Sequence, residues 1–141
     1  MPNYSGPANA TTTNTVPPLP VALYPGDKGI VFNAEQPAAP PQASISVALG
    51  ERPGGGVKTL SVEGFWSGAP GNFEVDLQTS DTDADGSYQA EGAGITQASA
   101  GVNTTANTFR AEFANVSANF ARLVLKTRAN AVNLTAGIRN Q

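Results

Sequence analysis

Residues 72–79 read NFEVDLQT, in which apolar and polar side chains alternate without a break. In an extended chain, residues two apart share one face. The stretch therefore predicts a β-strand of an antiparallel sheet that is buried on one side only. The side chains expected to point inward are Phe73, Val75 and Leu77, and those expected to face solvent are Glu74, Asp76 and Gln78.

Similar patterns occur on both sides of this stretch. Alternation predicts strands at 44–49, 57–66, 107–115 and 130–138, with two short strands, or one strand and a loop, around Tyr88 and Ile95. The continuously apolar residues 120–126 are typical of a strand covered on both faces. Short strands separated by Gly, Pro, Asn and Asp indicate an all-β fold, here an antiparallel, jelly-roll-like β-sandwich over residues 43–141.

The N-terminal part of the chain has a different composition. Nine of the 11 prolines lie within residues 1–41. Proline fixes φ and removes a backbone donor, so this part cannot be helical or supply a central strand. We expect residues 1–42 to form an extended arm that is ordered by docking on a partner, a flexible tail being the alternative. The predicted docking residues come from two apolar patches: Val21, Leu23, Tyr24, Ile30, Val31 and Phe32.

The composition of the 141-residue chain excludes several kinds of chemistry. It contains no Cys and no His, so disulfides, thiolate nucleophiles and imidazole bases or metal ligands are absent. The general bases and nucleophiles of common enzymes are missing or lack partners. We therefore expect a protein that is not an enzyme and that uses no cofactor.

The N-terminal residues and the charge bear on location and partners. No secretory signal and no run of about 20 apolar residues is present, which predicts synthesis in a cytoplasm and no membrane partner. The net charge of -3 argues against a nucleic-acid partner. Residues 51–91 carry eight acidic and two basic side chains, whereas 110–141 carry five basic and one acidic. These regions form either opposite poles for contact between copies or cross-strand pairs within one copy.

One loop and one aromatic pair are candidate sites. Asp81, Asp83 and Asp85 precede Gly86 in a D-x-D-x-D-G pattern that suits calcium, although the Glu that a helical calcium loop needs at position twelve is replaced by Gly92. A solvated acidic hairpin turn is the alternative. Trp66 is a candidate interface or ligand aromatic, and because Phe65 is its neighbour in a strand, only one of the two need be in the core.

The segments GFWSGAPGNFEV (64–75) and NFARLVL (119–125), with a Pro/Thr/Asn-rich arm before a Cys- and His-free β domain, give the chain its resemblance. It resembles tailed-bacteriophage virion proteins, most closely the small head decoration (cement) proteins. The resemblance implies a location on the capsid surface, the major capsid protein as partner, and a homotrimer or other homo-oligomer. The alternatives are a neck, tail or fibre component, or a carbohydrate-binding module that uses Trp66, Tyr88 and a calcium ion at Asp81–Asp85.

Overall fold

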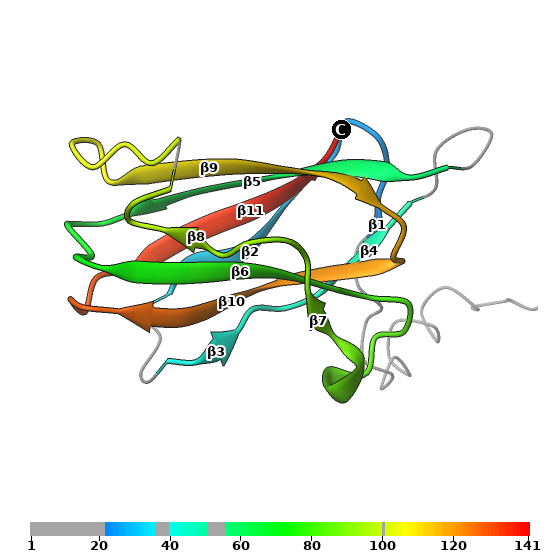
Figure 1. Ribbon diagram of the computed structural model, residues 1–141, viewed down its shortest axis with the longest axis horizontal. Coiled ribbons are helices and arrows are strands. Elements are labelled where there is room, and N and C mark those ends of the chain that lie inside the picture. The colour runs from blue at the N-terminus through cyan, green and yellow to red at the C-terminus, as the bar shows by residue number, and fades with distance from the viewer. Residues whose placement is uncertain (1–21, 36–39, 51–55, 100) are drawn as a thin grey trace, which may run out of the picture.

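The computed structural model describes residues 22–35, 40–50, 56–99 and 101–141. These residues form two β-sheets that pack face to face, with one short 3-10 turn at Asp85–Ser87 (Figure 1). The predicted all-β sandwich is thus confirmed. Within the described residues, no helix is long and apolar enough to cross a membrane.

Sheet A has two long central strands, β6 (Phe73–Ser80) and β10 (Phe120–Arg128), which pair antiparallel. Short strands cover their outer edges: β1 (Ala22–Leu23), β3 (Gln42–Ala43), β4 (Val47–Leu49), β7 (Gln89–Ala90) and β8 (Ile95–Thr96). Of these, β3 and β4 pair with β10, and β7 and β8 pair with β6. The pairing of β1 with β4 is parallel. Both long strands therefore have neighbours on both sides.

Sheet B contains four long strands in the order β2-β11-β5-β9, and all its pairs are antiparallel. Their bounds are β2 (Lys28–Glu35), β11 (Leu134–Asn140), β5 (Lys58–Trp66) and β9 (Thr108–Val116). The edge strands β2 and β9 are eight and nine residues long. Sheet B thus presents a broad outer face between two long edges.

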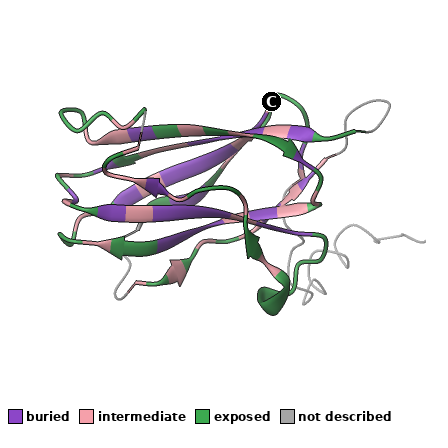
Figure 2. Cartoon of the chain, viewed as in Figure 1, coloured by how far each residue is buried: buried purple, intermediate pink, exposed green. Residues whose placement is uncertain are grey.

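The core lies between the sheets, and buried residues recur along the long strands of both sheets (Figure 2). Phe73, Val75 and Leu77 are buried as predicted. Near the start of β6, Trp66 packs against Phe73 with ring centroids 5.2 Å apart, and Phe109 lies 5.5 Å from Phe73. This aromatic cluster joins β5 and β9 of sheet B to β6 of sheet A.

A glycine of β5 makes room for the cluster. A Cβ built on Gly64 would lie 2.3 Å from Cζ of Phe109, which is far inside van der Waals contact. The Phe109 ring therefore covers the strand where the side chain of residue 64 is missing. This packing requires glycine at that position because even one methyl group would displace the ring.

The structure corrects the predicted domain boundary at residue 43. Strands β1 and β2 precede that residue, yet they pair with β4 and β11 and belong to the sandwich. The prolines flank β2 and do not interrupt it: Pro25 lies in the turn before the strand, and Pro40 and Pro41 follow it. The run 28–35 can therefore pair along β11. The remainder of the predicted arm, residues 1–21, lies outside the described residues.

Two side chains of sheet A differ from the alternating pattern. Asp76 was expected to face solvent but is buried, because the segment leading into β8 covers it; Gly94 lies so close that a Cβ there would meet both Glu74 and Asp76. Ile45 has the same spacing as the buried Val47 and Leu49 in the predicted strand 44–49, but it is 66% exposed because it lies in an irregular stretch between β3 and β4. Period-two alternation does not extend through that stretch.

Candidate functional site

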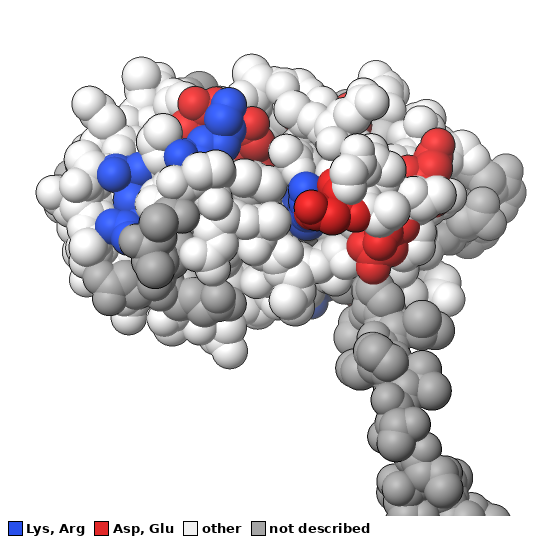
Figure 3. Space-filling view, turned by 90° about the horizontal axis from the view of Figure 1, so that it is seen from below, with Lys and Arg blue, Asp and Glu red and all other residues white. Residues whose placement is uncertain are grey.

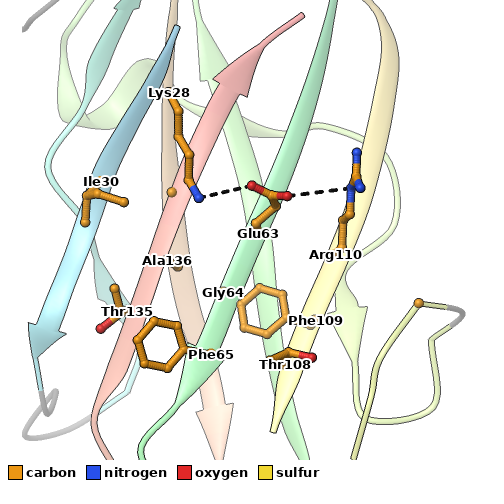
Figure 4. A pocket seen from close by; sticks show the side chains of 12 residues that line it. Lys28, Ile30, Glu63, Gly64, Phe65, Thr108, Phe109, Arg110, Thr135 and Ala136 are labelled. Atoms are coloured by element: carbon orange, nitrogen blue, oxygen red, sulfur yellow. Dashed lines mark ion pairs between the residues drawn. The ribbon is translucent and has the colours of Figure 1, made fainter. Parts of the chain in front are cut away.

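The outer face of sheet B carries a groove of about 370 Å³, which we call the sheet B groove (Figure 4). All four strands of the sheet contribute to it. Its side-chain walls come from Lys28, Ile30, Glu63, Phe65, Thr108, Arg110 and Thr135. The groove is therefore a property of the whole sheet and not of one loop.

The groove is hollow because β11 lacks a side chain at Gly137. A Cβ at this position would approach the carbonyl oxygen of Gly29 to 2.9 Å, Cε of Lys28 to 3.0 Å and Cδ1 of Ile30 to 3.2 Å. The side chains of Lys28 and Ile30 extend over β11 in this space. Glycine thus allows β2 and β11 to pack closely and keeps the middle of the outer face low.

One part of the groove is apolar and exposed. Phe65 on β5 is 51% exposed, and Ile30 on β2 is 45% exposed. Thr135 of β11 pairs with Phe65 in the sheet and lies on the Ile30 side of its ring in Figure 4. Thr108 of β9 pairs with Phe65 on the other side. The result is an aromatic ring between two threonines, facing an isoleucine.

The other part of the groove is charged, and its charges are paired. Nζ of Lys28 lies 3.0 Å from Oε1 of Glu63, and Nε of Arg110 lies 3.8 Å from Oε2 (Figure 4). The hydrogen bond from Lys28, with the nearby positive charges, lowers the pKa of Glu63 despite its partial burial. Glu63 is therefore ionised at neutral pH and holds the two cations along the groove.

The chain was compared with models of known protein families and with curated proteins, and neither comparison finds a match.

The structure divides the six predicted docking residues into different environments. Leu23, Val31 and Phe32 are part of the core, so the prediction that they dock on a partner is corrected. Pairing of β1 with β4 places Leu23 in the sandwich, and pairing of β2 with β11 does the same for Val31 and Phe32. Tyr24 and Ile30 are exposed. The structure brings only Ile30 into the groove. Val21 lies outside the described residues.

The structure also replaces Trp66 by Phe65 as the exposed aromatic residue of this strand. Trp66 is only 3% exposed and packs within the aromatic cluster, so it is not a surface ligand or interface residue. The exposed member of the pair is Phe65. A signal for this was present in the sequence, because Phe65 and Trp66 are neighbours in a strand and point to opposite faces. The contributions of Thr108 and Thr135 had no such signal, since they depend on strand order.

In the acidic loop, two of the three aspartates have partners of their own. The hydroxyl of Tyr88 donates a hydrogen bond of 2.6 Å to Asp83, and Arg122 pairs with Asp85 at 2.5 Å. The Arg122 guanidinium also lies 4.2 Å from the centroid of the Tyr88 ring. Burial and the bond to Asp83 raise the pKa of Tyr88 to about 12. Among the described residues, no group of three or more His, Cys, Asp or Glu side chains is placed to hold a metal, Asp81, Asp83 and Asp85 included.

The uneven charge along the sequence is compensated within one copy. Arg122 of β10 reaches Asp85, and Lys126 of β10 lies 3.5 Å from Glu74 and 3.6 Å from Asp76 of β6. Red and blue atoms accordingly lie side by side in parts of the face that Figure 3 shows, although one blue patch there has no red beside it. Burial, and the neighbouring Glu74, raise the pKa of Asp76 against the effect of Lys126. Cross-strand pairing, the second of the two interpretations of the charge pattern, fits these contacts.

Proposed function

We propose that this chain is a non-enzymatic structural protein of a virion, made in the host cytoplasm, that binds the capsid exterior. It would stabilise the head by bridging subunits of the major capsid protein, as a decoration or cement protein does. The observation that carries the proposal is the sheet B groove, in which Phe65 and Ile30 are exposed on a broad sheet face.

The chemistry of the groove is that of a protein contact. Aromatic residues are enriched in the centres of protein interfaces, where they are surrounded by polar side chains. Phe65 has this setting, with Thr108 and Thr135 beside it and paired charges beyond. The proposed work of the molecule is burial of this surface against other protein subunits of the virion, in keeping with the phage-like segments of the sequence.

The fold is suited to such a role. Both long strands of sheet A are covered by shorter neighbours, and the large apolar side chains between the sheets are fully buried. Covered strands resist unwanted sheet extension. Sheet B, with its groove and two long edges, is the face we propose for contacts in the particle.

Binding to phage heads tests the proposal. Heads that lack this protein are mixed with the full chain and sedimented, and the bound fraction is measured against concentration. We expect saturable binding that Phe65→Ser weakens about tenfold or more. Ile45→Ser is the matched control, because it also removes an exposed apolar side chain but lies outside the groove. Binding to tails or fibres and not to heads would favour a neck, tail or fibre component. Equal binding of Phe65→Ser and Ile45→Ser to heads would reject the sheet B groove as the binding surface.

Carbohydrate binding is the second candidate, favoured by the exposed Phe65 ring between two threonine hydroxyls. Aromatic faces stack on apolar faces of sugars, and neighbouring hydroxyls can orient them. Phe65 would replace Trp66 in this role, since Trp66 is buried. A glycan array read with the wild type and with Phe65→Ser tests it: specific binding that the substitution abolishes supports the candidate, and no binding across the array rejects it.

A further inference from the structure

We infer that the sheet B groove binds residues 15–21 of a second copy of this chain. This inference rests on the proposed function and deepens it, because it names a partner for the groove within the assembly. Three observations carry it: the sequence before Ala22, the make-up of the groove, and the distance between the two within one copy.

The sequence before Ala22 has the chemistry of a segment that binds aromatic grooves. Residues 15–21 read TVPPLPV, and no side chain between Met1 and Val21 is charged. Prolines at 17, 18 and 20 favour the extended polyproline geometry. Proline-rich segments dock in grooves lined by aromatic residues, at a low entropic cost because their geometry is already restricted. Leu19 supplies a large apolar side chain among the prolines.

The apolar part of the groove offers matching contacts. Phe65 and Ile30 provide exposed apolar walls on either side of β11. Between them, Oγ1 of Thr135 accepts a hydrogen bond of 3.0 Å from the backbone N–H of Ala34. The hydroxyl hydrogen of Thr135 can then be donated to a carbonyl of the incoming segment. Carbonyls in polyproline geometry need such outside donors, since they have no internal partners.

The charged part of the groove favours an uncharged occupant. Lys28 and Arg110 both pair with Glu63, and Arg110 also lies 3.5 Å from Glu112. An acidic or basic segment would have to compete with these pairs. A segment without charges leaves them intact, and residues 15–21 meet that condition.

Strand β1, where the described chain starts, lies toward one end of the sandwich (Figure 1), and the pairing and packing of β5 place Phe65 toward the other. Ala22 pairs with Ala48, Ala48 pairs with Phe120, and Phe120 pairs with Ser80, the last residue of β6. Trp66, the neighbour of Phe65, instead packs on Phe73, the first residue of β6. The seven steps along β6 correspond to about 23 Å at ~3.3 Å per residue.

Residues 17–20 cannot cover that distance within one copy. Pro17 is five residues before Ala22, so a fully extended chain carries it at most about 18 Å, and Pro20 at most about 7 Å. Pro18, Leu19 and Pro20, which are closer still to Ala22 along the chain, therefore fall short of the Phe65 ring of the same copy. A neighbouring copy has no such limit, and the exchange would link copies into the oligomer expected of a decoration protein.

The test is the mass of the full chain in solution, measured by light scattering or native mass spectrometry over a range of concentrations. We expect the wild type to form a multiple of the 14.4 kDa chain. Phe65→Ser and the double variant Pro18→Ala/Pro20→Ala should each raise the dissociation constant of the oligomer about tenfold or more. Ile45→Ser should leave it unchanged. Fluorescence of Trp66, the single tryptophan, reports whether each variant is folded, and Ile30→Ser replaces Phe65→Ser if that variant fails to fold.

A synthetic peptide with the sequence of residues 15–22 provides the second arm of the experiment. It should dissociate the wild-type oligomer and shift the amide resonances of Phe65, Thr108 and Thr135, whereas a peptide with alanine in place of the prolines should not. A monomeric wild type, or an oligomer indifferent to both substitutions and to the peptide, would overturn the inference. Head binding is scored separately: a monomer that binds heads rejects this inference alone, and an oligomer that does not bind heads rejects the proposed function alone.

Discussion

Replacing Phe32 by alanine tests whether β2 is part of the folded domain. Phe32 is fully buried between the sheets, whereas Ile30, two residues earlier on the same strand, is 45% exposed in the groove. Truncating a buried phenylalanine costs about 3–5 kcal/mol in lost burial and cavity formation. Ile30→Ala removes a half-exposed side chain and should cost under about 1 kcal/mol.

Urea unfolding followed by Trp66 fluorescence measures both variants, because this single tryptophan is buried against Phe73 and loses that environment on unfolding. With a urea dependence of about 2 kcal/mol per molar, Phe32→Ala should lower the midpoint by about 2 M. Ile30→Ala should shift it by less than about 0.5 M. Equal midpoints for the two variants would refute the assignment of β2 to the sandwich and restore an arm that begins before residue 28.

Three further predictions concern other parts of the fold. Gly64→Ala should destabilise the protein by about 1–3 kcal/mol in thermal unfolding, because the added Cβ meets the Phe109 ring. The double variant Gly64→Ala/Phe109→Leu should recover part of this loss, and no recovery would mean that the Phe109 ring is not the obstacle. Because the pKa of Asp76 is raised in the folded state, its contribution to stability is fully present below pH 3.8, the ordinary pKa of the group, and is lost as the pH rises through the folded-state pKa. The stability of Asp76→Asn relative to the wild type should therefore increase between pH 4 and 7 in urea unfolding. A difference in stability that stays constant across that range would contradict a raised pKa. Millimolar calcium should leave the melting temperature unchanged, because Asp83 and Asp85 already bind Tyr88 and Arg122; a rise with calcium concentration would identify a site.

Much of the fold follows from local patterns, since alternation depends only on which side chains share a strand face. It correctly assigns the buried side of β6, and the continuous apolar run of β10 fits a central strand. It fails for Asp76, because the segment around Gly94 that covers this residue comes from another part of the chain, and only the pairing of β8 with β6 brings it close. It also fails for β2, where the many prolines around the strand concealed a proline-free run with two adjacent buried residues, Val31 and Phe32.

The groove was less accessible to sequence reasoning. Strand parity indicated that only one of Phe65 and Trp66 need lie in the core, but the larger ring was the natural candidate for the surface. Only the packed structure gives Trp66 a place between Phe73 and Phe109. The juxtaposition of Ile30 with Phe65 depends on β11 lying between β2 and β5, a strand order that no local pattern contains.

A reconstruction of phage heads with and without the full chain is the most direct measurement of the proposed role. We expect added density on the outer capsid surface that fits the two-sheet domain, positioned across a boundary between capsid subunits and with the outer face of sheet B against protein. Heads without added density, or a domain bound only to the tail or standing with sheet B facing solvent, would contradict the account.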